Sequence, residues 1–196
     1  MFSCLYNYGL SLLYKNPPST TLSREIATTI ARPNINGVDI AMGAMVIDGV
    51  YIGSIMTATD STWLRAHCIG AVVDAGGFPY IKTVSTTSVA IDDCNVTLDL
   101  IDRYMEVFKR CARVVAREHA EGRNVLVHCA VGMNRSAAII GFYLADMGYQ
   151  YDDIIALLTR ANRTRGIPVL TNITFRYLLR TYCACRSTAG LCPLSR

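Results

Sequence analysis

The sequence has few charged residues and very few lysines. Charged side chains make up 17% of its 196 residues and hydrophobic ones 52%, which excludes a disordered or acidic solvating chain. With 3 lysines against 16 arginines, nearly every positive group is a guanidinium, which suits phosphate. The densest basic cluster, Arg160, Arg163 and Arg165, is smaller than the stripe typical of nucleic-acid binders. We interpret it as a solvated helix end and do not expect nucleic acid as a partner.

The sequence also has no apolar run of about 18 residues, the length that a membrane helix requires. Its opening segment, Met1 to Leu13, has no basic flank and no small-residue cleavage site. We therefore expect a soluble chain with no membrane partner. The eight cysteines lack the dense spacing of small secreted scaffolds, which favours a reducing, cytoplasmic compartment. Cys183 and Cys185 form a C-x-C pair near Cys192, but no second ligand pair accompanies them, so we expect no zinc site.

The length is that of one ordinary domain with short extensions. Residues 1–43 are interpreted as an N-terminal extension, with a short helical pattern from Leu22 to Ala31. The apolar positions of that pattern could pack on the domain or on a second copy, so a homodimer through the extension is a hypothesis. Residues 44–184 are expected to form the domain itself, and residues 185–196 a C-terminal tail.

Hydrophobic patterning predicts an α/β domain. Two apolar runs around Asp48-Gly49 predict a hairpin that begins at Ala44. Later apolar runs are typical of strands in a sheet covered on both faces, and apolar positions at helical spacing indicate helices. The predicted strands are Ile69–Val73, Ser88–Ile91, a short one near Tyr80 and Asn124–Val127; the predicted helices are Leu98–His119, Arg135–Met147, Tyr151–Ala161 and Thr171–Tyr182.

One stretch carries residues for chemistry: a buried strand ends at His128-Cys129 and a helix begins near Arg135. A loop between a strand and a helix directs backbone N–H groups and the positive end of the helix dipole into one concavity, which binds anions. A cysteine there has a depressed pKa, roughly 3.5 to 7.5, and is a ready nucleophile at neutral pH. Arg135 is placed to bind two phosphoryl oxygens in a bidentate way.

The other residues of this stretch fit the same interpretation. Gly132 allows a tight turn, Ser136 can donate its hydroxyl to the sulfur, and His128 is expected to orient the loop rather than transfer a proton. A lone cysteine at a strand end is usually packing, but Cys, Gly, Arg and Ser together at this spacing favour catalysis. The predicted phosphate-binding loop consists of Cys129, Ala130, Val131, Gly132, Met133, Asn134 and Arg135.

The stretch H-C-x-x-G-x-x-R-S resembles the signature of cysteine-dependent protein tyrosine phosphatases, in the dual-specificity branch typified by a small poxvirus enzyme. Val50–Ser54, Leu64 with Ile69–Val73, and the N-x-x-F-x-x-L pattern from Asn172 to Leu178 are similar to other parts of that branch, so the resemblance covers Ala44 to Tyr182. It implies a protein tyrosine phosphatase-like fold, with a central, mostly parallel mixed sheet flanked by helices. It also implies a viral origin as one option, in host cytoplasm or virion.

The resemblance further implies a protein phosphatase that removes phosphate from phosphotyrosine and from phosphoserine or phosphothreonine through a cysteinyl-phosphate intermediate. No metal or cofactor takes part. The family uses an aspartate before the long helix as general acid. Asp92 is the first candidate and Asp93 the alternative, although the 37 residues from Asp92 to Cys129 exceed the usual spacing. At least one of the two carboxylates is expected to cap a helix or stay solvated.

Other functions remain open on the sequence. The enzyme could act on RNA 5′ ends or another non-protein phosphate, or the chain could be a pseudophosphatase that only binds phosphorylated partners. The absence of Lys and Arg at the variable loop positions argues against inositol lipids. Cys94 lies beside the candidate acid, so a reversible disulfide with Cys129 under oxidation is a further hypothesis.

Overall fold

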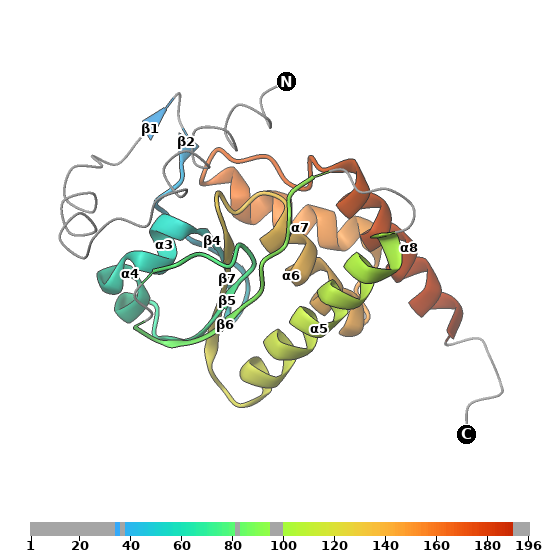
Figure 1. Cartoon of the computed structure of the whole chain (residues 1–196), viewed down its shortest axis with the longest axis horizontal. Helices are drawn as coiled ribbons and strands as arrows, with labels where there is room; N and C mark the ends of the chain where they lie inside the picture. Colours follow the sequence, from blue (N-terminus) through green and yellow to red (C-terminus); the bar gives the residue numbers. More distant parts are fainter. Residues whose placement is uncertain (1–33, 36–37, 81–82, 95–99, 190–196) are drawn as a thin grey trace. The chain divides into compact units, whose positions relative to one another are not determined.

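The computed structural model describes residues 34–35, 38–80, 83–94 and 100–189 (Figure 1). The helical pattern expected at residues 22–31, with its hypothetical role in a homodimer, lies outside the described residues, as does Cys192. The described part opens with two short antiparallel strands, β1 (Asn34–Ile35) and β2 (Val38–Asp39). The domain bounds 44–184 stay a prediction.

Five strands form the central sheet, in the order β3-β4-β7-β5-β6. They are β3 (Ala44–Ile47), β4 (Val50–Ser54), β7 (Asn124–Cys129), β5 (Ile69–Asp74) and β6 (Ser85–Ser88). β3 runs antiparallel to β4, and the other neighbouring strands are parallel. The mostly parallel mixed sheet expected from the resemblance is therefore confirmed.

The register brings the carboxyl ends of three strands together. Ser54 at the end of β4 pairs with Cys129 at the end of β7, and Asp74 at the end of β5 pairs with His128. In open α/β sheets, binding sites form outside the carboxyl ends of the strands. The predicted phosphate-binding loop starts at this edge of the sheet.

The hairpin predicted around Asp48-Gly49 is confirmed, because β3 and β4 are joined there by a two-residue turn. Gly49 has φ +72°, a conformation that glycine adopts without steric cost. A Cβ at this position would lie 2.8 Å from Nε2 of His119 at the end of α5 (Ile101–Ala120). Both the turn and the close approach of the helix therefore favour glycine.

The strand predicted at Ser88–Ile91 is wrong by three residues. The observed β6 consists of Ser85, Thr86, Thr87 and Ser88, which lie at the sheet edge and are half-buried or exposed. Because an edge strand does not need apolar residues, the search for an apolar run selected the residues that follow it. The short strand predicted near Tyr80 is also wrong, since Tyr80 lies in no strand and binds His128 through its hydroxyl instead.

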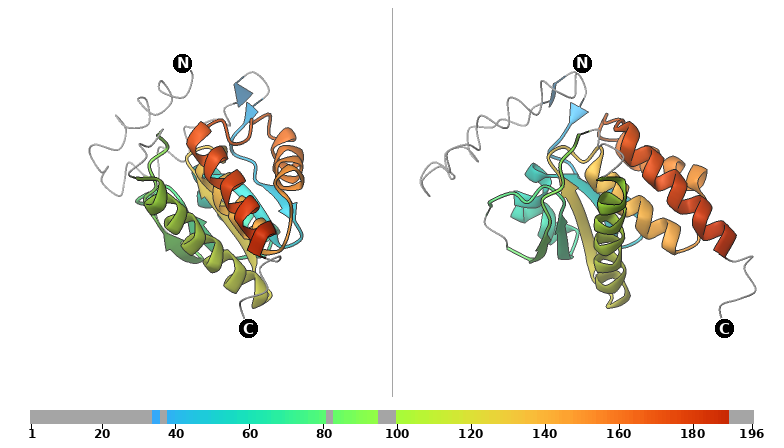
Figure 2. Two further views of the ribbon diagram at one scale, coloured as in Figure 1. Left: turned by 90° about the vertical axis from the view of Figure 1, so that its right-hand side faces the viewer. Right: turned by 45° about the vertical axis from the view of Figure 1, so that its right-hand side comes forward.

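Helices cover both faces of the sheet (Figures 1 and 2). Three long helices lie against one face, a fourth packs on one of them, and two short helices lie on the other face. The long helices are α5, α6 (Arg135–Asp146), α7 (Tyr151–Arg163) and α8 (Ile173–Ala189), of which α8 packs on α6; the short ones are α3 (Ile55–Thr59) and α4 (Ser61–Ala66).

Strand β7 is buried on both faces, as its continuous apolar run predicts. Val125 and Val127 belong to the large core under the long helices, whereas Leu126 between them belongs to a smaller core on the side of α3 and α4. All three side chains are fully buried. The strand that carries Cys129 is thus held rigidly from both sides.

The long helices were predicted with small errors at their ends. α8 begins two residues later than predicted, at Ile173, and continues past Tyr182 to Ala189, so the expected tail is helical at its start. The sequence did not indicate α3, whose start is capped by the Ser54 hydroxyl, while the helix that the resemblance implied at Leu64 is α4. None of the helices in the described ranges is long and apolar enough to cross a membrane.

Candidate active site

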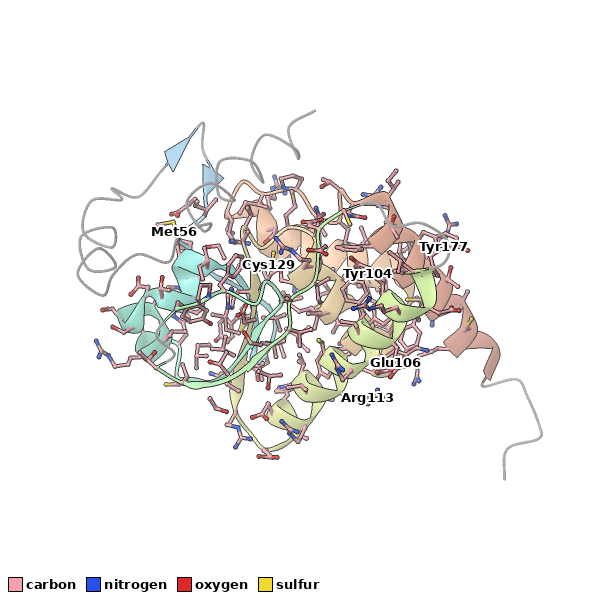
Figure 3. The ribbon with its side chains drawn as sticks, viewed as in Figure 1. Met56, Tyr104, Glu106, Arg113, Cys129 and Tyr177 are labelled. Atoms are coloured by element: carbon pink, nitrogen blue, oxygen red, sulfur yellow. The ribbon has the colours of Figure 1, made fainter. Side chains whose placement is uncertain are left out.

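Cys129 lies at the carboxyl end of β7, where the chain turns through a loop into α6 (Figure 3). Its Sγ accepts a hydrogen bond from the backbone N–H of Gly132 at 3.3 Å and lies 3.5 Å from the Ser136 hydroxyl. Burial by itself raises the pKa of the thiol, but the charge of Arg135 and hydrogen bonds from Ser136 and Gly132 outweigh it. They bring the pKa of Cys129 to about 7, so a thiolate forms at neutral pH.

Gly132 makes the loop possible. It has φ +86°, and a Cβ there would lie 2.6 Å from the carbonyl oxygen of Gly53 on β4 and 2.5 Å from Nη1 of Arg165. Any other residue would push the loop away from the neighbouring strand. The turn brings the Gly132 amide onto the sulfur.

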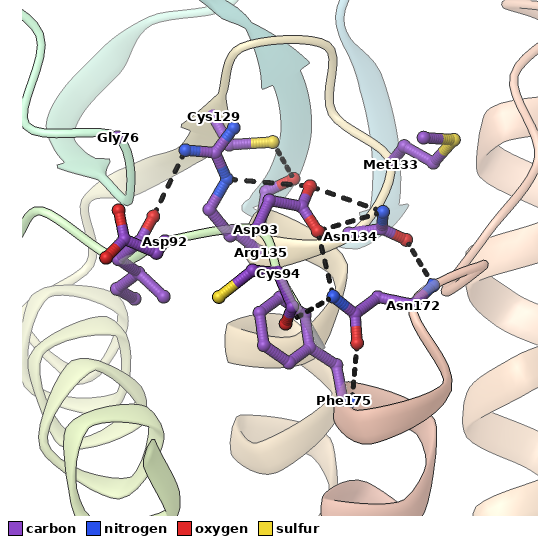
Figure 4. A network of polar contacts seen from close by, with 12 residues as sticks. Gly76, Asp92, Asp93, Cys94, Cys129, Met133, Asn134, Arg135, Asn172 and Phe175 are labelled. Atoms are coloured by element: carbon purple, nitrogen blue, oxygen red, sulfur yellow. Dashed lines mark hydrogen bonds and ion pairs between the residues drawn. The ribbon is translucent and has the colours of Figure 1, made fainter. Parts of the chain in front are cut away.

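Arg135 is the first residue of α6, and its side chain returns to the loop. Its Nη1 donates to the carbonyl oxygen of Ile91 at 3.1 Å, and its Nε lies 3.7 Å from Oδ2 of Asp93 (Figure 4). That Nε is buried and has no hydrogen-bond partner among the described residues. Because buried donors are almost always paired, this N–H is suited to bind an anion next to Cys129.

Arg165 is a site residue that the sequence did not reveal. It is fully buried and donates to three carbonyl oxygens, those of Met42 at 2.6 Å, Val131 at 2.7 Å and Gly132 at 3.2 Å. Burial lowers the pKa of Arg165 to about 10, against the attraction of Cys129 and Asp39. It therefore stays charged at neutral pH and supports the loop from behind.

The interpretation of the arginine cluster as a solvated helix end holds for Arg160 and Arg163, which are exposed, and is wrong for Arg165. Two residues of the loop itself, Val131 and Gly132, supply carbonyl groups to the buried guanidinium. Backbone acceptors do not show in a sequence, so nothing there distinguished this arginine from its exposed neighbours.

His128 lies behind the loop and is fully buried. Burial and the negative charge of Asp74 raise the pKa of Tyr80, so its hydroxyl stays protonated and can donate to Nε2 of His128, 2.9 Å away. The other ring nitrogen lies 3.3 Å from the carbonyl oxygen of Cys129. Nε2 also lies 3.7 Å from Oδ1 of Asp74, whose side chain is fully buried as well. This placement suits the predicted orienting role better than proton transfer.

The two candidate acids lie in different environments. Asp92 is exposed, and its carboxylate has no hydrogen bond or ion pair within the described part of the chain. The carboxylate of Asp93 is engaged by side-chain amides instead: Asn134 Nδ2 lies 3.2 Å from both oxygens, and Asn172 Nδ2 lies 3.1 Å from Oδ1. Asn134, predicted as part of the phosphate-binding loop, thus turns its side chain toward Asp93.

The described residues contain no cluster of three or more His, Cys, Asp or Glu side chains that could hold a metal ion. Cys94 is exposed, and its Sγ lies 3.9 Å from the hydroxyl of Tyr104 on α5. Its disulfide with Cys129 stays a hypothesis.

Residues 50–184 match the family model described as dual specificity phosphatase, catalytic domain. A protein of Dictyostelium discoideum, described as a probable dual specificity protein phosphatase, is 32% identical over 106 residues, which make up 54% of this chain and 47% of that protein. The chain thus matches about half the length of this curated relative.

Solved structures show the same fold. Human DUSP28 is similar with a TM-score of 0.64 and 17% identity, over 74% of this chain and 99% of that one. OH1 of the Orf virus, described as a tyrosine phosphatase with triple substrate specificity, gives a TM-score of 0.57 and 22% identity, over 73% of this chain and 87% of that one.

Proposed function

Since the chain belongs to the dual specificity phosphatase family of cysteine-dependent protein phosphatases, we propose that it hydrolyses phosphotyrosine and phosphoserine or phosphothreonine in proteins through a cysteinyl-phosphate intermediate. The observation that carries this proposal is a buried thiol, whose pKa is about 7, at the same loop as Arg135, whose Nε–H has no hydrogen-bond partner among the described residues. A nucleophile and an anion-binding donor are thus placed for one phosphoryl group.

In the first step, the Cys129 thiolate attacks phosphorus and the Sγ–P bond forms. The bond from phosphorus to the substrate's oxygen breaks, and that oxygen takes a proton from Asp92. Arg135, the loop amides and the start of α6 stabilise the charge that develops on the other phosphoryl oxygens. The product of this step is a phosphocysteine and a free hydroxyl on the protein substrate.

In the second step, the Asp92 carboxylate accepts a proton from water while the water oxygen attacks phosphorus. The Sγ–P bond breaks, inorganic phosphate leaves, and the electron pair returns to sulfur. The hydroxyl of Ser136, 3.5 Å from Sγ, can donate to the thiolate that departs. No step requires a metal or another cofactor.

The different environments of the two carboxylates support Asp92 as the acid. A general acid must reach the leaving oxygen, and the carboxylate of Asp92 is exposed and binds no other described group. The carboxylate of Asp93 is already held by the side-chain amides of Asn134 and Asn172, which leaves it less free to reach the leaving oxygen.

The variable positions of the phosphate-binding loop carry no charged side chain. This favours a protein substrate with single phosphoryl groups over an inositol lipid with several. Ala130, Val131 and Met133 are half-buried there, and none carries a charge. The alternative, an RNA 5′ end, loses one of the three cations of the basic cluster, because Arg165 is buried while Arg160 and Arg163 are exposed. The pseudophosphatase alternative loses support because both Cys129 and Arg135 are retained.

The test compares a small aryl phosphate with matched phosphotyrosine and phosphothreonine peptides, in the presence of EDTA and reductant. We expect hydrolysis of all three by the wild type and none above background by Cys129→Ser. Cys68→Ser is the matched control, because Cys68 is exposed and outside the proposed machinery, and it should keep full activity. Activity that survives Cys129→Ser, or that is confined to a non-protein phosphate, would overturn the proposal.

Because a nucleophilic thiolate is readily oxidised, we also propose that the chain acts in a reducing compartment such as the cytoplasm. Cys94 is the candidate partner for a protective disulfide with Cys129, on the ground that it lies in the loop that carries Asp92. Mass spectrometry after peroxide treatment tests this proposal. Recovery of no peptide that links the two cysteines would contradict it.

A further inference from the structure

Asn134 is positioned unexpectedly for a residue of the phosphate-binding loop. It comes directly before Arg135, yet its side chain is turned away from Cys129 and is almost fully buried. Its Nδ2 donates toward both oxygens of Asp93, and its Oδ1 accepts from the backbone N–H of Asn172 at 3.1 Å and from the Thr171 hydroxyl at 3.2 Å. One amide thus joins the phosphate-binding loop to two other segments.

Asn172 completes the connection (Figure 4). Its Nδ2 donates to Oδ1 of Asp93 at 3.1 Å and to the carbonyl oxygen of Cys94 at 3.0 Å, while its Oδ1 accepts from the N–H of Phe175 in the first turn of α8. The Asp93 carboxylate can only accept, and both amide groups present donors to it. We call Asp93, Asn134 and Asn172 the amide clasp.

The segment after Asp92 is held by the amide clasp, and the segment before it is held by Arg135. The carbonyl oxygen of Ile91, just before Asp92, accepts from Arg135 Nη1 at 3.1 Å. The carboxylate of Asp93, just after it, is held by the side-chain amides of Asn134 and Asn172. The backbone on both sides of Asp92 is therefore tied to residues at the active site, while the Asp92 carboxylate remains unbound within the described residues. Such support is what a general acid requires, because an error of about 1 Å can cost roughly a hundredfold in rate.

We propose that Asp93 and Asn134 are positioning residues for the reaction, which hold Asp92 where it can protonate the leaving oxygen. This inference rests on the proposed function and extends it. It also gives the second aspartate a role distinct from that of the acid. Asp93 contributes through its fixed carboxylate and its neighbours, not through transfer of its own proton.

The choice of leaving group tests this role. An acidic phenol leaves without a proton, whereas an alkyl or unsubstituted phenyl oxygen needs one, so the loss of a correctly placed acid affects the second class most. We expect Asn134→Ala and Asp93→Ala to lower kcat/KM by roughly tenfold to a hundredfold on phenyl phosphate, but by about twofold or less on an aryl phosphate of an acidic phenol. The comparison uses kcat/KM because it reports the first step, whereas hydrolysis of the phosphocysteine, in which Asp92 activates water, is common to both substrates. The nearly isosteric Asp93→Asn should show the same pattern if Asp93→Ala fails to fold.

A double variant separates positioning from a general structural effect. If Asn134 acts through Asp92, adding Asn134→Ala to Asp92→Asn should cause no further loss on phenyl phosphate. Asn124→Ala is the matched control: this asparagine, at the start of β7, donates to the His67 carbonyl oxygen away from the clasp. It should leave the leaving-group dependence unchanged even if the protein becomes less stable.

Each other outcome has a definite meaning. Equal losses on both phosphate classes, wild-type rates in the clasp variants, or additive losses in the double variant would overturn the positioning role while the proposed function stands. Activity that survives Asp92→Asn but not Asp93→Asn would make Asp93 the acid, which also overturns it. A folded wild type that hydrolyses neither class would overturn the proposed function and this inference with it.

Discussion

At the scale of single residues, the reactivity of the site depends on opposing effects at Cys129. Burial favours the neutral thiol, and a buried cysteine without compensating groups is inert: burial raises the pKa of Cys111 to about 11. At Cys129 the Arg135 charge and the hydrogen bonds to the sulfur outweigh burial, and the pKa is about 7. The same elements that bind a phosphoryl group therefore also prepare the nucleophile.

This balance predicts a pH dependence. The rate of Cys129 alkylation by iodoacetamide should rise with pH as the thiolate forms and reach half its maximum near pH 7. Arg135→Met removes the attraction that lowers the pKa, so the midpoint should move to higher pH. Peptide mass spectrometry measures the reaction at Cys129 alone. A midpoint that is unchanged in the variant would contradict this explanation.

Arg165 allows a prediction about stability. Arg165→Met keeps much of the side-chain volume but removes the guanidinium donor from the carbonyl groups of Met42 and Val131, and leaves that of Gly132 with Asn162 Nδ2 as its side-chain donor. We expect the free energy of unfolding to fall by about 3 kcal/mol. The exposed Arg163 is the matched control, and Arg163→Met should change it by about 0.5 kcal/mol or less. Urea denaturation of both variants checks this, and equal effects would contradict it.

Residues close together in the sequence were the ones that could be predicted. Cys129, Gly132, Arg135 and Ser136 lie within one strand, loop and helix, so local spacing already places them together. Arg165 contacts the Gly132 carbonyl group across 33 residues and that of Met42 across 123. Such contacts depend on how distant segments pack, which a single sequence does not display.

At the scale of elements, the site depends on a turn that only glycine fits. Gly132→Ala would force a side chain into a left-handed conformation and against the Gly53 carbonyl oxygen, so we expect a loss of about 3 kcal/mol or more in stability and a large loss of activity. Gly122 also has a positive φ, +77°, but a Cβ there meets no described heavy atom within 4 Å.

Gly122→Ala is therefore the matched control, and it should cost about 1 kcal/mol from backbone strain alone, with activity retained. Thermal unfolding and the turnover of an aryl phosphate measure the two effects. If both alanine variants behave alike, the close approach of the loop to β4 is not what requires glycine at position 132.

The elements with strong apolar patterns were predicted best. α5 has a regular apolar stripe that includes Phe108, Ala112 and Val115, all buried, and the apolar run of β7 is buried on both faces. β6 was misplaced because its hydroxyl residues lie at the sheet edge, where burial imposes no apolar pattern.

At the scale of the whole molecule, the parallel sheet gathers the parts of the site. The ends of β4 and β7 adjoin, and segments that carry Asp92, Cys129 and Arg165 meet at that edge although they are far apart in the chain. The family resemblance implied the sheet and the roles of the segments that carry Asp92 and Cys129, but not the place of Arg165. It left the choice between the two aspartates open, because that depends on the clasp contacts of Asn134 and Asn172.

The proposed mechanism passes through a covalent phosphocysteine at Cys129, and an acid quench during turnover of a phosphotyrosine peptide can trap this intermediate. Ser136→Ala should slow the departure of sulfur and let the intermediate accumulate, because the hydroxyl 3.5 Å from Sγ is lost. We predict that mass spectrometry finds one added phosphoryl group on the peptide that contains Cys129, and none in Cys129→Ser. Turnover with no modified cysteine in either the wild type or Ser136→Ala would contradict the mechanism.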